Sequence, residues 1–265
     1  MFQLILQLHI TGQCNLRCKH CYISEHAQEL SIDTIKNIFF QLSELVNELE
    51  RVKSKKFPVS IHITGGEPLC HSEIHTILDM LFEQRSKYRI GIMSNGTMLD
   101  DDTLIMLSKL NLKALQVSLD GCCETHDKIR GNGNFLSVLH ALDLLYQYGI
   151  PSRVSFTANK ENYIAFPFVA DICRRHHVKS LWSDRIIPFE NNSAIKPIDN
   201  ESDMKKYVDI LANEKNNEQN KLFGLRIDNH RALQFIGTDD NPYWCTAGEQ
   251  LITVDEYGNV IDVNN

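Results

Sequence analysis

Apolar residues recur with two alternating periods along the first 190 positions of the chain. Six short runs of six to eight residues read as strands, and the first, Leu4–Ile10, is apolar at nearly every position, which is typical of a strand buried on both faces of a parallel sheet. Between these runs, apolar side chains recur every three to four residues, which predicts amphipathic helices. The predicted strands are 4–10, 59–64, 88–93, 114–119, 152–157 and 180–187, and the predicted helices are about 32–49, 73–85, 101–110, 135–148 and 164–176.

This alternation predicts an α/β fold. Strands that alternate with helices form a parallel sheet with right-handed crossover connections. Eight such units would close a TIM barrel, whereas six leave a partial barrel with an open side. We therefore expect residues 1–190 to form a partial, six-unit βα, TIM-like barrel.

The pattern changes after Pro188, so residues 191–265 are expected to form a second, smaller α+β extension. Its first part is rich in Asn, Ser, Pro and Asp, as linkers are. Its last part has two short apolar runs around a turn that contains Gly258, which predicts a β-hairpin. The expected elements are a linker at 191–201, a helix at about 204–213, a loop to Lys221, a short strand at 225–228, and hairpin strands at 250–254 and 260–263.

Three thiols, Cys14, Cys18 and Cys21, lie within eight residues directly after the first predicted strand. Thiolates bind zinc or iron–sulfur clusters. A structural zinc site needs four ligands, and His20 lies awkwardly between two of the cysteines. Three ligands on a four-iron cluster would leave one iron open for another molecule. A zinc loop and three purely structural thiols remain alternatives.

This loop resembles the cluster motif of radical S-adenosylmethionine (SAM) enzymes, including His20 and Tyr22. The resemblance implies that Cys14, Cys18 and Cys21 hold a [4Fe–4S] cluster whose open iron chelates the amino and carboxylate groups of SAM. In that family, one electron from the cluster cleaves SAM, and the resulting 5′-deoxyadenosyl radical takes a hydrogen atom from the substrate. The expected cofactors are therefore the cluster and SAM, with an electron donor such as flavodoxin or ferredoxin as a partner. The family's barrel fold agrees with the partial barrel predicted above.

A second motif, Gly65-Gly66-Glu67-Pro68, follows the second predicted strand about 45 residues after the cysteines. Glycines let the backbone approach a ligand closely, and a carboxylate can accept hydrogen bonds from an ammonium group. On its own, this tetrapeptide is a generic turn. In the family, the segment binds the amino group of SAM, which implies a contact from Thr64, Gly65, Gly66 and Glu67.

Polar residues also follow the third and fourth predicted strands. Ser94 and Asn95 end the third strand, Ser118 ends the fourth, and Arg130 follows. The family places ribose and carboxylate contacts to SAM here, and Ser118 and Arg130 match its sulfatase-maturase and peptide-maturase branch. An arginine suits a carboxylate because its donors form a planar fork. The alternative for each residue is a helix cap or a turn.

Residues 243–248 and the hairpin after them resemble the start of a SPASM or twitch extension, which carries auxiliary clusters in enzymes that mostly modify peptides. The family pattern places a second Cys five positions after a Gly. Here Cys245 and Gly258 are separated by twelve residues, and Val263 occupies the position of the second Cys. One thiol cannot hold a four-iron cluster. We therefore expect no second cluster, either because the extension has lost it or because the chain is truncated.

The composition of the chain narrows the possible partners and the possible cellular setting. The net charge of −7 argues weakly against a nucleic-acid partner. The chain contains no run of 18 apolar residues, the length needed to span a membrane, and its first residues lack an export signal. Adjacent Cys122 and Cys123 do not suit a disulfide framework, so we expect a reducing, cytoplasmic setting. Cysteines 70, 122, 123 and 173 are expected to be small buried residues.

These observations predict a radical SAM enzyme that acts on a peptide or protein side chain, by cross-linking, epimerisation or oxidation. The peptide expectation comes from resemblance to one branch of the family. One alternative is a radical SAM enzyme with a small-molecule substrate in cofactor or natural-product biosynthesis. Another is a metal-binding protein without catalytic activity. No catalytic acid or base can be identified.

Overall fold

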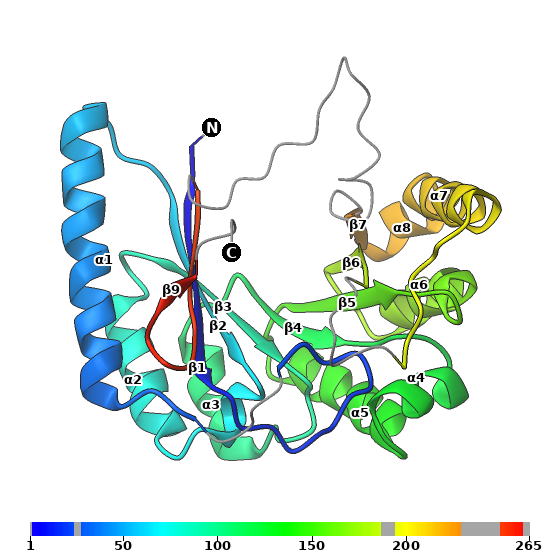
Figure 1. The fold of residues 1–265 in the computed structure, drawn as a ribbon, viewed down its shortest axis with the longest axis horizontal. Helices are drawn as coiled ribbons and strands as arrows, with labels where there is room; N and C mark the ends of the chain where they lie inside the picture. The colour runs from blue at the N-terminus through cyan, green and yellow to red at the C-terminus, as the bar shows by residue number, and fades with distance from the viewer. Residues whose placement is uncertain (1, 24–27, 187–193, 229–249, 262–265) are drawn as a thin grey trace.

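The computed structural model describes residues 2–23, 28–186, 194–228 and 250–261. In these residues nine strands form one sheet in the order β7-β6-β5-β4-β3-β2-β1-β8-β9. Strands β1 to β6 follow one another in the sheet as they do in the sequence (Figure 1). The strands are β1 Leu4–Thr11, β2 Val59–Gly65, β3 Arg89–Ser94, β4 Ala114–Ser118, β5 Ser152–Ala158, β6 Ser180–Arg185, β7 Arg226–Asp228, β8 Leu251–Val254 and β9 Val260–Ile261.

All neighbouring strands run parallel except β8 and β9, which form the predicted antiparallel hairpin. The two edges, β7 and β9, do not pair with each other, so the sheet is a curved, open layer. This confirms the α/β class and the partial barrel. It also shows that chain after residue 190 joins the same sheet, because β7 pairs with β6 and β8 pairs with β1. The division into two domains stays a prediction.

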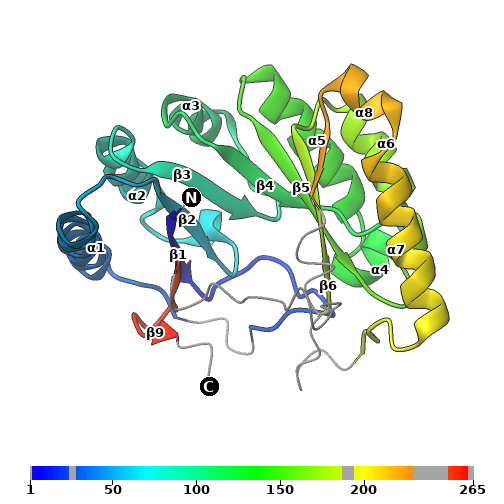
Figure 2. The same ribbon diagram turned by 90° about the horizontal axis from the view of Figure 1, so that it is seen from above.

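Helices cover the outer, convex side of the curved sheet, where α1, α2, α3, α5 and α6 follow the arc (Figure 2). The helices are α1 Ile32–Lys53, α2 Ile74–Gln84, α3 Asp101–Lys109, α4 Cys123–Arg130, α5 Asn134–Gln147, α6 Phe166–Arg175, α7 Glu201–Lys215 and α8 Glu218–Phe223, with short 3₁₀ helices at Pro68–Cys70 and Tyr163–Ala165. Ser31 caps α1 by accepting a hydrogen bond from Thr34 N, as its position predicted.

The two faces of the sheet differ in character. Leu6, Ile61 and Val117 point outward and are buried beneath the helices. Gln7 and Gln116 occupy alternate positions on the inner face and are only half-buried. The expectation that the first strand is buried on both faces therefore fails for Ile5 and Gln7 and holds for the second half of β1, where His9 is buried. The helices cover one face, and the other lines the inside of the arc.

Two helices were not predicted. The segment Cys123–Arg130 forms α4, and Glu218–Phe223 forms α8 where a loop was expected. The short α8 is capped at its N-terminus by Asn217, whose side chain accepts a hydrogen bond from Gln219 N. Its C-terminal cap is Gly224, which has the left-handed conformation. Neither helix has the periodic apolar stripe on which the prediction relied.

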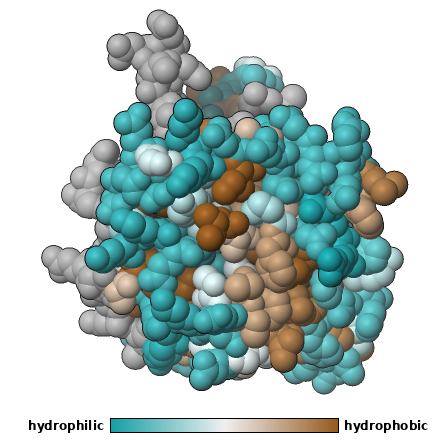
Figure 3. All heavy atoms as spheres, turned by 90° about the vertical axis from the view of Figure 1, so that its right-hand side faces the viewer, coloured by the Kyte–Doolittle hydropathy of each residue, from teal (hydrophilic) through white to brown (hydrophobic). Residues whose placement is uncertain are grey.

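The surface near α6, α7 and α8 is mostly hydrophilic with separate hydrophobic patches (Figure 3). Leu222 and Phe223 of α8 are 80% and 45% exposed. Scattered exposed apolar side chains of this kind are common in folded proteins. No helix in the part of the chain that the structure describes combines the length and apolar character needed to cross a membrane.

Candidate active site at the carboxyl ends of the strands

The cysteine loop lies at the carboxyl end of β1 and is held in place by its neighbours. Backbone hydrogen bonds run from Gly66 N to Thr11 O and from Glu67 N to Gln13 O, each at 2.7 Å. On the other side, Lys19 N donates to Ile129 O at 2.9 Å. The thiols of Cys14, Cys18 and Cys21 are half-buried and free, and none of the described cysteines forms a disulfide. The loop is thus fixed by chain segments from β2 and α4.

The two glycines after β2 are required by this close approach. Gly65 has a φ of +132°, which L-residues rarely adopt. A Cβ on Gly66 would lie 2.2 Å from Gln13 O and 2.7 Å from Gly12 O. Any side chain here would push the Gly-Gly-Glu segment away from the cysteine loop. The motif therefore has a structural purpose that is independent of any ligand.

Glu67 joins the ends of β2 and β3. Its carboxylate is fully buried and accepts hydrogen bonds from Ser94 Oγ (2.8 Å), Asn95 N (2.6 Å) and Leu69 N (3.2 Å). Burial raises the pKa of Glu67 to about 7, although these three donors oppose the shift. The side chain predicted to contact SAM is therefore also a buried link between strands.

Asn95 connects β3 to the first cysteine. Its Nδ2 donates to Asn15 Oδ1 at 2.8 Å and lies 3.9 Å from Cys14 Sγ. Leu16 N also donates to Cys14 Sγ, at 3.4 Å. Burial raises the pKa of Cys14 to about 11, so the thiol without a metal ion is protonated at neutral pH. Metal binding at this position would release a proton.

Arg130, at the end of α4, faces the second cysteine. Its Nε donates to Asp120 Oδ2 at 2.6 Å, its Nη1 lies 3.9 Å from Cys18 Sγ, and its Nη2 donates to His20 Nε2 at 3.3 Å. Burial and the charge of Arg130 lower the pKa of His20 to about 4. His20 is therefore neutral at pH 7 and accepts a hydrogen bond at Nε2.

Asp120 was not predicted as a site residue, although it lies two positions after Ser118. It is fully buried, and its Oδ1 accepts from Thr157 N at 2.9 Å. Burial is the largest single effect and opposes its ionisation, but Arg130, His20, His126 and the hydrogen bond from Thr157 N together outweigh burial and lower the pKa of Asp120. Its backbone N donates to His126 Nδ1 at 3.0 Å, so the proton of that imidazole lies on Nε2. Asp120 thus fixes Arg130 beside the cysteine loop.

The structure brings the predicted residues together in two groups. Cys14 lies with Glu67, Ser94 and Asn95, and Cys18 lies with His20 and Arg130. Gly65 and Gly66 pack against residues 11–13, just before the first cysteine. Thr64 is buried opposite His9 in the sheet, and Ser118 Oγ lies 3.4 Å from Ser155 Oγ on the inner face. The role of each residue as a cofactor ligand remains a prediction.

The turn of the C-terminal hairpin lies close to the cysteine loop. Glu256 Oε2 is 3.9 Å from His9 Nδ1, and the ring of His9 is 6.2 Å from that of Tyr22. The described part of the extension therefore borders the site. The motif at 243–248, Cys245 and Val263 lie outside the described residues.

The donor set fits a cluster held by three cysteines. Three N–H groups, from Leu16, Asn95 and Arg130, point to the thiols of Cys14 and Cys18, and hydrogen bonds to sulfur tune iron–sulfur clusters. In the described chain, no three His, Cys, Asp or Glu side chains are arranged around a single metal ion. A four-iron cluster instead takes each thiolate on a different iron, so three cysteines would leave one iron open.

The other described cysteines match the expectation of burial only in part. Cys173 is buried, as predicted. Cys70 and Cys122 are half-buried, and Cys123 is exposed, so the expectation of burial is wrong for Cys123. Cys123 lies in the first turn of α4, where the side chain faces solvent.

Comparison with known proteins identifies one matching family and relatives with several different names. The sequence profile described as the Radical SAM superfamily matches residues 8–177, more than half of the chain. The Fe-coproporphyrin III synthase of Methanosarcina barkeri is 28% identical over 231 residues, which cover 84% of this chain and 55% of that protein. The antilisterial bacteriocin subtilosin biosynthesis protein AlbA of Bacillus subtilis is 28% identical over 156 residues, or 58% of this chain and 33% of AlbA.

Two further similarities extend over almost the whole chain. A probable GTP 3′,8-cyclase of Methanococcus maripaludis is 27% identical over 282 residues, covering 98% of this chain and 87% of that protein. The crystal structure of Streptococcus suis SuiB bound to precursor peptide SuiA superposes with a TM-score of 0.77 at 16% identity, over 98% of this chain and 59% of that one. At this identity, the likeness to SuiB concerns the fold.

Proposed function

The chain belongs to the radical SAM superfamily, and from this premise we propose that it modifies a peptide or protein side chain. It is a radical SAM enzyme, and members of this family bind a [4Fe–4S] cluster and SAM. This membership favours an enzyme over the alternative of a metal-binding protein without catalytic activity. The substrate class is the part that we propose.

Cys14, Cys18 and Cys21 would hold the cluster, which with SAM supplies a radical that takes a hydrogen atom from the substrate. Around it, this chain positions its own groups. Asp120 fixes the guanidinium of Arg130 beside Cys18 through the 2.6 Å ion pair. A fixed guanidinium suits the carboxylate of SAM, and the segment from Thr64 to Glu67 suits its amino group. We assign Ser94, Asn95 and Ser118 to the same cofactor, as the resemblance implies.

The observation that supports a peptide substrate best is the open sheet. Its inner face is not closed off by pairing between β7 and β9, so an extended chain can lie along it. The similarly folded SuiB was crystallised with a precursor peptide. AlbA, by its name, takes part in the biosynthesis of a bacteriocin. This chain spans only part of both proteins, so their activities enter here as support for a proposal.

A mass-spectrometric assay tests the proposal. The protein is reconstituted with iron and sulfide without oxygen, then incubated with SAM, dithionite and any short peptide encoded beside its gene. We expect a peptide that has lost two hydrogen atoms, or one that gains deuterium from heavy water. Formation of 5′-deoxyadenosine with every such peptide left unchanged would contradict the proposal.

A small-molecule substrate is the second candidate. The end-to-end match to a probable GTP 3′,8-cyclase favours it, because this match leaves little of either chain unpaired. The same assay with GTP in place of the peptide separates the two candidates. Conversion of GTP would favour the small molecule, and an unchanged nucleotide beside a modified peptide would favour the peptide.

A further inference from the structure

The inner face of the sheet carries a group of cations near the amino ends of its strands. Arg89, Lys113, Arg153 and Arg226 stand at or beside the first residues of β3, β4, β5 and β7. The register places Arg153 opposite both Gln116 and Ser180, and Ser180 opposite Arg226. In the described chain, none of the four cations has a carboxylate within 4.0 Å.

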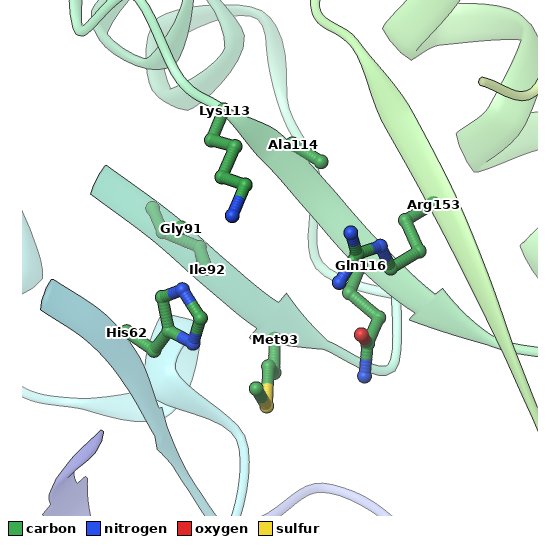
Figure 4. Close-up of a pocket in the computed structure, with 8 residues that line it drawn as sticks. All are labelled: His62, Gly91, Ile92, Met93, Lys113, Ala114, Gln116 and Arg153. Atoms are coloured by element: carbon green, nitrogen blue, oxygen red, sulfur yellow. The ribbon is translucent and has the colours of Figure 1, made fainter. Parts of the chain in front are cut away.

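A solvent-connected pocket of about 300 Å³ lies beside two of these cations, Lys113 and Arg153. Figure 4 shows His62, Lys113 and Arg153 reaching from β2, β4 and β5 toward the same space in front of β3. Gly91 of β3 leaves this space open, because a Cβ there would lie 3.0 Å from His62 Cδ2. Ile92, Met93, Ala114 and Gln116 complete the lining.

The pocket has a local excess of positive charge in a chain whose net charge is −7. Arg153 Nε donates to Ser180 Oγ at 3.0 Å, and no acceptor among the described residues reaches its two terminal nitrogens. Burial and the charges of Arg153, Arg89 and Arg226 lower the pKa of Lys113, a sign of repulsion among the cations. The carboxylate of Asp228 is the nearby negative charge that acts on Arg153. Clustered cations of this kind attract anions.

We propose that this pocket binds an acidic side chain of the peptide substrate, with Lys113 and Arg153 on its carboxylate. This inference rests on the proposed peptide modification. The pocket is open to solvent, which suits one side chain of a substrate that continues outside it. The guanidinium of Arg153 offers two free donors to one carboxylate.

The position of the pocket also sets a spacing. Arg153 is four residues before Thr157, whose N–H binds Asp120 beside Arg130 and the cysteine loop. At about 3.3 Å per residue, the pocket lies roughly 13 Å from that end of the strand. An extended peptide covers this distance in about four residues. The anchored acid therefore lies about three to five residues from the modified position.

Calorimetric titration tests the proposal on the reconstituted protein at low salt. The probe is an N-acetylated, C-amidated Gly-Glu-Glu-Gly-Gly peptide, and its partner probe has Gln in place of Glu. We expect the Glu peptide to bind at least tenfold more tightly than the Gln peptide. The double variant Lys113→Gln, Arg153→Gln should lose at least tenfold in affinity for the Glu peptide. The control Lys36→Gln, Arg175→Gln removes the same charge from exposed helix positions and should stay within twofold of the wild type.

A second measurement on the wild type covers the case in which the double variant does not fold. Trace acetylation with acetic anhydride labels lysines according to their accessibility and charge state. The Glu peptide should slow labelling of Lys113 at least threefold and leave exposed Lys36 unchanged. Equal labelling of Lys113 with and without the peptide would overturn the proposal, as would a double variant that binds within twofold of the wild type.

Inorganic pyrophosphate serves as the third probe. If it binds tenfold more tightly than the Glu peptide and protects Lys113, the pocket selects phosphate and the assignment to an acidic side chain is wrong. Binding is measured here without SAM. A failed binding test therefore leaves peptide modification to its own assay, and failed modification leaves the binding result unaltered.

Discussion

Glu67 serves the fold and the site at the same time. Its motif resembles a segment that contacts SAM, yet its buried carboxylate already accepts hydrogen bonds from Leu69, Ser94 and Asn95. Asp120 is similar, since it binds Arg130 and the backbone of Thr157. The sequence identified the first from its motif. It could not identify the second, because the partners of Asp120 lie 10 and 37 positions away.

Replacing Cys18 with Ala tests the ligand assignment. With three cysteines on one cluster, wild-type protein should hold about four irons per chain, and Cys18→Ala should hold almost none. The control is Cys123→Ala, which removes an exposed thiol on α4 and should keep the wild-type iron content. Colorimetric iron analysis after anaerobic reconstitution measures this. Full iron content in Cys18→Ala would refute the assignment, and about eight irons in the wild type would refute the absence of a second cluster.

The imidazole of His62 should make the free energy of unfolding depend on pH. Burial and the charges of Lys113 and Arg153 lower its pKa from 6.5 to about 4. Its neutral form therefore stabilises the fold fully above pH 6.5, and this contribution is lost as the pH falls toward 4. When the pH falls from 7 to 5, the free energy of unfolding of the wild type should drop by about 1–2 kcal/mol more than that of His62→Gln.

Urea unfolding at both pH values, with the two proteins in parallel, measures this difference. The control is His140→Gln, which removes an exposed histidine on α5. If His62→Gln and the wild type lose equal free energy, the environment assigned to His62 is wrong.

At the scale of elements, the strands and the longer helices could be predicted because each has a strong apolar period. The helices α4 and α8 could not, because their contacts are polar and specific. In α8, Asn220 accepts a hydrogen bond from buried Arg174 of α6 at 3.0 Å, and Arg174 also pairs with Glu214 of α7 at 3.1 Å. A buried polar network of this kind leaves no periodic signal in the sequence.

Arg174→Met tests how α7 and α8 pack on α6. The substitution leaves the Glu214 carboxylate buried without its partner, so the free energy of unfolding should fall by about 3 kcal/mol. Its neighbour Arg175 has a side chain that is 74% exposed, and Arg175→Met should cost less than about 0.5 kcal/mol. Urea unfolding measures both, and equal losses would contradict this packing.

Gly66→Ala tests the contact between the end of β2 and the cysteine loop. The added Cβ would meet Gln13 O, so we expect a loss of about 3 kcal/mol in stability together with reduced iron content. The control Gly224→Ala places a Cβ in open space at a φ of +66° and should cost about 1 kcal/mol without loss of iron. Thermal unfolding and iron analysis report the two effects. A Gly66→Ala protein that matches the control in both measurements would exclude the proposed contact.

At the scale of the whole molecule, the open parallel arc was predictable, and the pairing of the strands that extend its two edges into chain after residue 190 was not. The hairpin strand β8 returns to pair with β1, with Leu251 opposite Ile5. No local pattern predicts pairing between residues this far apart in the chain. This pairing places the turn at Glu256 beside His9, next to the candidate site.

The account as a whole depends on SAM cleavage at the site formed by the carboxyl ends of β1 to β4. The direct measurement is chromatographic detection of 5′-deoxyadenosine after the reconstituted protein is mixed with SAM and dithionite in the absence of oxygen. We expect 5′-deoxyadenosine from the wild type and none from Cys18→Ala. A wild-type protein that binds zinc in place of an iron–sulfur cluster and releases no 5′-deoxyadenosine would contradict the account.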